Sequence, residues 1–193
     1  MVEGKKDPTI DKNKIILISA GAGLGTLVLG FLIWSAIFSS QFAVFKDKDY
    51  HLSIKYPRGW TVAKGYEGTI VTFVSPKEDG LDVFQENLNI AVQGLSNPPM
   101  PLSQFTELAI KQMNAVFKTS IKAVESKPIT YAGLPAYVYA VKATDSRGIS
   151  LKFIWFIKDG QAYTITCAAQ LLRSEKYTRT FDEMLRSFSI SAY

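Results

Sequence analysis

Hydrophobic and polar positions are distributed unevenly along the chain, and the longest apolar run lies near its N-terminus. Ile15 to Phe38 include no charged side chain. As a helix, this run would be about 36 Å long at ~1.5 Å per residue, enough to cross a hydrocarbon core of roughly 30 Å with some tilt. A signal peptide has a shorter apolar region followed by two small residues at a spacing of two, and Ser35 to Ala43 contain no such pair. We therefore predict a polar stub at residues 1–13 and a retained transmembrane helix at residues 14–39.

Lysines flank this run asymmetrically, which predicts its orientation. Those before it are Lys5, Lys6, Lys12 and Lys14, and those soon after it are Lys46 and Lys48. Because short cytoplasmic flanks collect Lys and Arg, we expect a cytoplasmic N-terminus and an extracytoplasmic C-terminal part, in a periplasm or a thylakoid lumen. The chain is then a single-pass membrane protein with a connector at residues 40–49 and an extracytoplasmic domain at residues 50–193.

Small residues within the apolar run offer a surface to another helix. Gly21 and Gly25 have the spacing that lets two backbones approach closely in lipid, and Trp34 suits the membrane interface. The candidate residues for contact with a partner helix are Gly21, Gly25, Thr26, Gly30 and Trp34. Glycine is also common in membrane helices that have no specific partner, so both interpretations stay open.

After the connector, the pattern is that of strands. Period-two alternation or short apolar runs bounded by turn residues predict strands at residues 51–57, 60–63, 69–75, 87–93, 121–131, 134–143, 150–158 and 161–169. Ala132-Gly133 and Asp159-Gly160 suit the positive φ angles of two-residue hairpin turns. The last two strands are apolar almost throughout, which indicates a central hairpin covered on both faces.

Two segments have helical periodicity with one apolar face. The first runs to about Phe117, with Ser103 as its expected cap and Glu107 in its first turn. The second starts near Ser174. Its apolar side consists of Tyr177, Phe181, Met184, Leu185 and Phe188. Both helices are expected to pack on the sheet.

Composition excludes several classes of function. The net charge is +5, but the sequence has no Lys/Arg cluster of the kind that binds nucleic acid. Cys167 is the single cysteine, so it cannot form an internal disulfide, and its apolar surroundings suit a buried position. Because His51 is the single histidine, we expect neither a multi-histidine metal site nor a Cys-His catalytic pair. We therefore predict that the protein is not an enzyme and uses no cofactor.

Four acidic residues are close together between two predicted strands. Glu78, Asp79, Asp82 and Glu86 are weak candidates for a metal site, because calcium prefers clustered oxygen ligands. Their spacing is not that of an EF-hand, and a plain solvated loop is the simpler interpretation. Val83 and Phe84 in the same segment suit either a contact surface or the core.

The order of several motifs resembles the PsbP family. They include Tyr-Pro-x-Gly-Trp after the first strand, an Ala-Gly-Leu-Pro-Ala-Tyr turn and a Lys-Asp-Gly-Gln-Ala-Tyr hairpin. The resemblance covers about Tyr50 to Ile190, through Tyr56, Pro57, Gly59, Trp60, Asn87, Gly133, Pro135, Tyr137, Gly160, Tyr163, Thr164, Ser187 and Phe188. It implies an α+β fold, namely an α/β/α sandwich with a central antiparallel sheet. It also implies a binding module without catalysis, used in photosystem II as an extrinsic lumenal subunit.

Two functions follow as expectations. In the first, the protein is a non-catalytic, membrane-anchored accessory or assembly subunit of a larger membrane protein complex, for which photosynthetic and electron-transfer complexes are candidates. Its partners are then the subunits of that complex and the lipid bilayer, not nucleic acid. In the second, it is a free-standing tethered protein that binds an ion, a lipid or a small ligand.

Overall fold

A computed structural model describes residues 41–65, 68–80, 82–95, 100–117, 120–143 and 148–191. The predicted stub, the predicted transmembrane helix and its five candidate contact residues lie outside the described residues. Within the described part of the chain, no helix has the length and apolar character needed to span a bilayer. Residues Ala43–Tyr193 form one compact unit.

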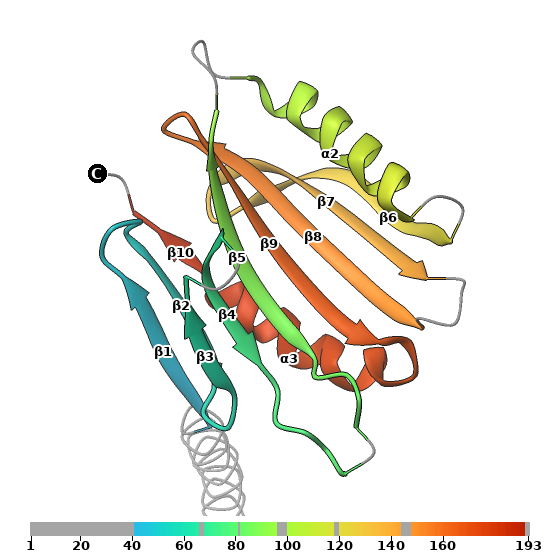
Figure 1. Ribbon diagram of the computed structural model, residues 1–193. Coiled ribbons are helices and arrows are strands. Elements are labelled where there is room, and N and C mark those ends of the chain that lie inside the picture. The colour runs from blue at the N-terminus through green and yellow to red at the C-terminus, as the bar shows by residue number, and fades with distance from the viewer. Residues whose placement is uncertain are drawn as a thin grey trace, which may run out of the picture. The chain divides into compact units, whose positions relative to one another are not determined.

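A seven-stranded antiparallel sheet forms the centre of this unit (Figure 1). In chain order its strands are β3 (Thr61–Lys64), β4 (Thr69–Val74), β5 (Asn87–Gly94), β6 (Ile121–Tyr131), β7 (Leu134–Ala143), β8 (Ile149–Lys158) and β9 (Gln161–Gln170). The order across the sheet is β3-β4-β5-β9-β8-β7-β6, so the predicted hairpin β8–β9 is central. The edge strand β6 carries Pro128 and a register shift between Ala123 and Glu125, features that discourage pairing with another chain.

A second, three-stranded sheet was not predicted. It consists of β1 (Phe42–Asp47), β2 (Leu52–Pro57) and β10 (Ser189–Ile190), in the order β1-β2-β10. The expectation that residues 40–49 are a connector was therefore wrong, because β1 lies within them. Phe45 accounts for the difference, since its buried ring packs edge-on against Phe73 at a centroid distance of 5.7 Å.

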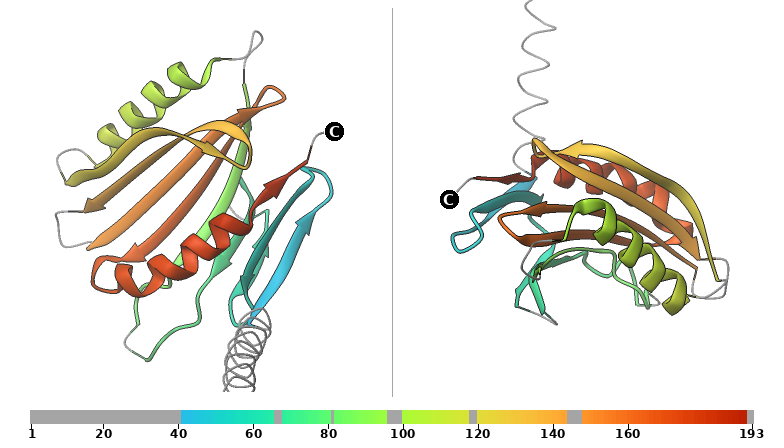
Figure 2. Two further views of the ribbon diagram at one scale, coloured as in Figure 1. Left: turned by 180° about the vertical axis from the view of Figure 1, so that it is seen from behind. Right: turned by 90° about the horizontal axis from the view of Figure 1, so that it is seen from above.

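One helix covers each face of the large sheet. The helix α2 (Leu102–Phe117) packs on β7 and β8, and α3 (Ser174–Ser187) packs on β9 and β2 (Figure 2). The fold is thus α+β with antiparallel sheets, as predicted. Ser103 is not the cap of α2, because the helix already begins at Leu102 and Pro101 O accepts the Phe105 N–H at 3.0 Å. Glu107 consequently lies beyond the first turn.

Both predicted hairpin turns are confirmed. Ala132 and Gly133 have φ angles of 49° and 79°, and Asp159 and Gly160 have φ angles of 51° and 73°. Positive φ at both central residues matches the right-handed twist of the adjoining strands. The turns therefore fix the register of β6 with β7 and of β8 with β9.

Replacing Gly133 with alanine should lower the free energy of unfolding by about 1 kcal/mol, because an L side chain at positive φ is sterically strained. The added Cβ would meet no atom within 4 Å, so the cost comes from the backbone conformation alone. Gly59→Ala is the matched control, since Gly59 also has open space but no positive φ. Urea unfolding of a fragment of residues 40–193 measures both. Equal stability of the two variants would contradict the assigned turn.

Candidate functional site

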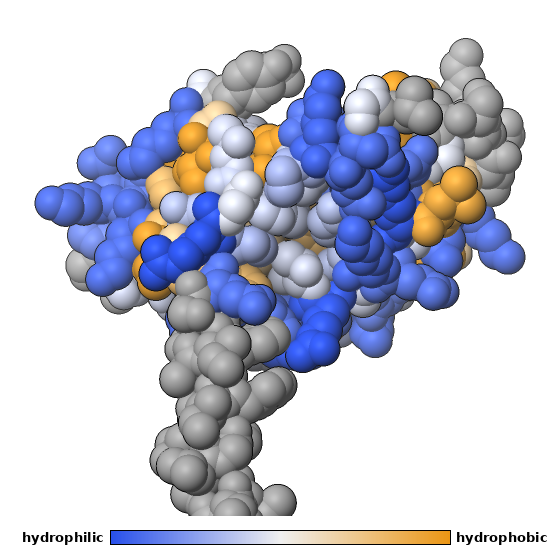
Figure 3. Space-filling model, turned by 90° about the horizontal axis from the view of Figure 1, so that it is seen from below, coloured by the Kyte–Doolittle hydropathy of each residue, from blue (hydrophilic) through white to orange (hydrophobic). Residues whose placement is uncertain are grey.

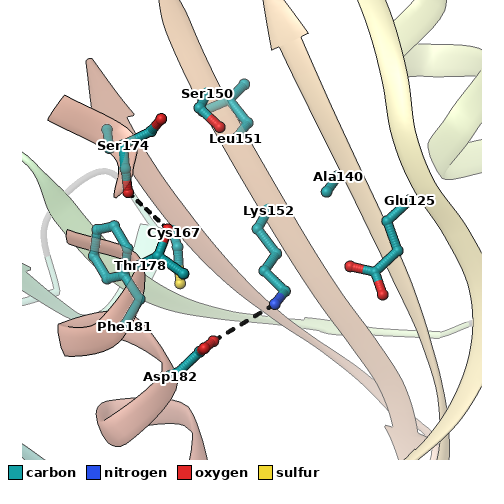
Figure 4. A pocket seen from close by; sticks show the side chains of 11 residues that line it. Glu125, Ala140, Ser150, Leu151, Lys152, Cys167, Ser174, Thr178, Phe181 and Asp182 are labelled. Atoms are coloured by element: carbon teal, nitrogen blue, oxygen red, sulfur yellow. Dashed lines mark hydrogen bonds and ion pairs between the residues drawn. The ribbon is translucent and has the colours of Figure 1, made fainter. Parts of the chain in front are cut away.

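A pocket of about 170 Å³ lies between α3 and strands β6 to β9 of the large sheet (Figure 4). Small side chains on the strands, such as Ala140 and Ala169, leave this space beneath the helix. Its lining consists of Glu125, Ala140, Ser150, Leu151, Lys152, Cys167, Ala169, Ser174, Thr178, Phe181 and Asp182. A cavity of this size holds a small molecule of a few non-hydrogen atoms.

An ion pair crosses the pocket from the sheet to the helix. Lys152 Nζ on β8 lies 3.7 Å from Asp182 Oδ1 on α3. The two side chains are 37% and 35% exposed, so solvent weakens their attraction. Glu125 on β6 also lines the pocket, and its carboxylate lies 3.0 Å from Lys127 Nζ. Each carboxylate of the pocket is therefore paired with a lysine.

Two hydroxyl groups of α3 face the same space with their hydrogens already used. Ser174 Oγ donates to Leu171 O at 2.8 Å, and Thr178 Oγ1 donates to Ser174 O at 2.7 Å. The free lone pairs of both oxygens remain as acceptors. Together with Glu125 and Asp182 they make the pocket rich in acceptors, and it suits a small molecule that carries N–H or O–H donors.

A second hollow of about 380 Å³ adjoins the first at the ion pair, since Lys152 and Asp182 line both. Its lining includes Tyr131, Ile154 and Phe188. Tyr131 is held in place because its hydroxyl donates to Leu185 O at 2.9 Å and its ring stacks on Phe188 at 5.4 Å. The two hollows are therefore continuous with the same ion pair of Lys152 and Asp182.

Cys167 lies on the pocket floor as a buried residue of β9, as its sequence context predicted. Burial raises the pKa of its thiol to about 12. The thiolate, which is the nucleophilic form, is then scarce at neutral pH. His51 lies in the turn between β1 and β2, in the other sheet. The structure therefore does not bring the single cysteine and the single histidine together.

Thiol reagents should react with Cys167 very slowly at neutral pH in the folded protein and rapidly in urea. The reason is that burial both shields the sulfur and keeps it protonated. The measurement is the rate of labelling by a maleimide, followed by mass spectrometry, at increasing urea concentration. Rapid labelling without urea would show that the pocket opens readily to solvent.

Two of the four acidic residues that are weak metal candidates, Glu78 and Asp82, pair with cations of α3 and of the turn before it. Arg173 Nη1 lies 2.9 Å from Asp82 Oδ1, and Lys176 Nζ lies 2.7 Å from Glu78 Oε1. Tyr177 donates its hydroxyl to Glu78 Oε1 at 2.8 Å. Hydrogen bonds from Lys176 and Tyr177 hold the pKa of Glu78 below its ordinary value. The backbone N–H of Glu78 does the same for the pKa of Asp82, with Arg173 contributing.

Burial distinguishes this loop from the solvated loop that was the simpler expectation. Asp82 is 4% exposed and Glu86 is fully buried, with Ser75 Oγ donating to Glu86 Oε2 at 3.3 Å. The described residues include no group of three or more His, Cys, Asp and Glu side chains that could hold a metal ion. Val83 is 93% exposed, so it is not a core residue, whereas Phe84 is half-buried. Ion pairs therefore hold the loop against the domain, and the apolar side chain of Val83 projects from the loop into solvent.

Sequence reasoning missed Arg173, which is central to this arrangement. The helical pattern that starts near Ser174 puts Arg173 away from the apolar side, which predicts a solvated side chain, but this side chain is only 23% exposed. It lies beside Asp82 and Glu78, and Nη1 approaches Asp82 without the angle of a hydrogen bond. The signal in the sequence is an excess of carboxylates between two predicted strands, four against the single Lys77.

Comparisons with known proteins agree with the fold. Solved structures that resemble the chain include cyanobacterial PsbP (CyanoP) from Synechocystis sp. PCC 6803, with a TM-score of 0.60 and 15% identity over 78% of this chain and 93% of that one. LpqN of Mycobacterium tuberculosis, described as involved in cell envelope biogenesis, has a TM-score of 0.58 and 10% identity over 79% and 91%. A comparison with curated protein sequences finds no match. The PsbP family model matches residues 40–190, so the chain belongs to the PsbP family.

Proposed function

We propose that this protein is a non-catalytic accessory or assembly subunit of a membrane protein complex, held at the membrane by residues 14–39. One observation carries the proposal: the family match begins at residue 40, directly after the uncharged run of residues 15–38. A binding domain joined so closely to a membrane helix acts at the bilayer, where tethering raises its effective concentration toward membrane partners. The lysine asymmetry supports a position of the domain outside the cytoplasm.

The chemistry of the pocket beside α3 supports a role in binding. The thiol of Cys167 has a raised pKa of about 12, so it is a poor nucleophile. The carboxylates of Glu125 and Asp182 are paired with Lys127 and Lys152. Carboxylates paired in this way are suited to hydrogen bonding and charge recognition.

Extraction of native membranes with a mild detergent tests the proposal. The full chain should co-migrate with a larger complex on a native gel. The double variant Gly21→Leu with Gly25→Leu should reduce this co-migration, because leucine keeps the segment apolar but prevents close approach of two helices. Gly23→Leu is the matched control, since position 23 lies on the opposite side of a helix from position 21. A single small species for the wild-type chain would contradict the proposal.

A second candidate function is binding of a small ligand by the tethered domain. The acceptor-rich pocket favours it, because Ser174, Thr178, Glu125 and Asp182 present acceptors around one space. Small amines and polyols should then raise the melting temperature of the domain by mass action. The same compounds should have a weaker effect on the Asp182→Asn variant. If none of these compounds raises the melting temperature, the small-ligand function is contradicted, and the accessory-subunit proposal is the one that remains.

A further inference from the structure

Two apolar side chains, Val83 and Leu172, are almost fully exposed at one end of the domain. Each is 93% exposed. They lie on neighbouring segments, because Asp82 and Arg173, which adjoin them in sequence, are 2.9 Å apart. The Asp82 side chain is 1% exposed and that of Arg173 is 23% exposed. A largely buried ion pair therefore fixes the two backbone segments from which Val83 and Leu172 project into solvent.

This end of the domain is also the end at which β1 begins. Strand β1 starts at Phe42 beside the end of β2, and Trp60 follows β2. The Trp60 ring contacts Tyr177 at a centroid distance of 6.1 Å, and the Tyr177 hydroxyl donates to Glu78 in the loop that carries Val83. In Figure 1 the start of β1 and the loop between β4 and β5 both lie at the lower end. Figure 3 views the molecule from below and shows a mainly hydrophilic surface with small, separate hydrophobic patches.

We propose that this end of the domain rests on the lipid bilayer, with the side chains of Val83 and Leu172 in the interfacial region. The inference rests on the proposed membrane anchor at residues 14–39. Only residues 39–41 separate the uncharged run from β1, and three extended residues span at most about 11 Å. Because the proposed anchor leads directly into β1, the end at which β1 begins is the part of the domain tethered nearest to the bilayer.

The size of the exposed apolar surface favours lipid over a protein partner. Among the described residues of this end, Val83, Leu172 and the 54% exposed Val44 of β1 are far fewer than the ~20–30 residues that each partner contributes to a stable protein interface. Shallow contact with the boundary between headgroups and acyl chains needs only a few apolar side chains, because the rest of the surface stays hydrated. The pair of Asp82 and Arg173 joins the two backbone segments that carry these side chains, so less backbone freedom is lost on contact.

A fluorescent label at each position tests the contact directly. The full chain is reconstituted in phosphatidylcholine vesicles as the variants Val83→Cys, Leu172→Cys and Lys48→Cys, each carrying a nitrobenzoxadiazole label. Lys48 is the control, because it is exposed in the turn that follows β1, at the opposite end of that strand. Buried Cys167 stays unlabelled. Lipids brominated near the headgroup end of the acyl chain quench labels that reach the interface.

Quenching at positions 83 and 172 should be several times the quenching at position 48. An alkaline wash of the same vesicles tests the anchor separately. If the chain resists the wash but the labels at positions 83 and 172 are quenched no more than the label at position 48, the bilayer contact is overturned and the anchor is retained. Release of the chain by the wash together with unquenched labels would overturn both. If the fluorescence emission of these labels shifts to shorter wavelength only when the native complex is added, the two side chains belong to a protein interface. That result also overturns the proposal.

Discussion

Replacing Arg173 with methionine should destabilise the domain more than any replacement of an exposed lysine. Methionine keeps an apolar stem but removes the charge beside Asp82 and Glu78. Asp82 then retains hydrogen bonds from the N–H groups of Glu78 and Phe84, at 3.0 and 3.3 Å, but loses the guanidinium that lies 2.9 Å from it. The carboxylate of Asp82 would stay buried without its cation. Removing one partner of a buried ion pair in this way is strongly destabilising, because the remaining charge is uncompensated.

The matched control is Lys127→Met. Lys127 lies 3.0 Å from Glu125, so the distance resembles that of the Arg173 pair, but its side chain is 60% exposed. Exposed pairs contribute little because water and salt screen them. The urea midpoint of the fragment of residues 40–193 should therefore fall clearly for Arg173→Met and barely for Lys127→Met. Equal midpoints would show that solvent reaches Asp82 freely and that the loop is not anchored by charge.

The same variant should change the dependence of stability on acid. The pKa values of Glu78 and Asp82 are lowered in the folded protein from ordinary values of 4.5 and 3.8. A lowered folded pKa contributes stability that is present above the ordinary pKa and is lost as the pH falls through the folded value. The wild-type domain should thus lose stability progressively below about pH 4.5. In Arg173→Met this loss should be shallower, because Arg173 contributes to lowering both pKa values.

Local signals in the sequence predicted the central hairpins well. Ala132-Gly133 and Asp159-Gly160 required positive φ, and the strands on either side are those that the turns imply. The apolar face of α3 was equally clear, since Tyr177, Phe181, Met184 and Leu185 are all buried. These features depend on residues close together in the chain, so periodicity and turn chemistry suffice to find them.

Features that depend on distant residues were missed. Strand β1 was taken as a connector because its burial depends on Phe73. The carboxylates that partly bury Arg173 belong to a loop far away in the chain, so the local pattern predicts a solvated side chain. The pocket escaped notice because Ala140 and Ala169 create it by their small size, and an alternating pattern does not distinguish a small buried residue from a packed one.

The largest effect on stability is expected from Trp155→Ala, which should lower the free energy of unfolding by about 3–5 kcal/mol. Trp155 is 1% exposed and lies on the face of the sheet that α2 covers. Its ring stacks on Tyr137 at a centroid distance of 5.8 Å and meets Phe105 of α2 edge-on at 6.5 Å. The indole Nε1–H also donates to Thr106 Oγ1 of α2 at 2.8 Å. Alanine would remove both the packing and the hydrogen bond that hold α2 on the sheet.

Two further variants separate these contributions. Trp155→Phe keeps an aromatic ring but leaves the buried Thr106 hydroxyl without its donor, which should cost about 1–3 kcal/mol. Adding Thr106→Val removes the unsatisfied hydroxyl and should restore part of that loss. Urea unfolding measures all three proteins, and hydrogen exchange of the α2 amides reports whether the helix detaches before the sheet unfolds. A loss below about 1 kcal/mol for Trp155→Ala would mean that α2 is held by its peripheral contacts rather than by this aromatic cluster.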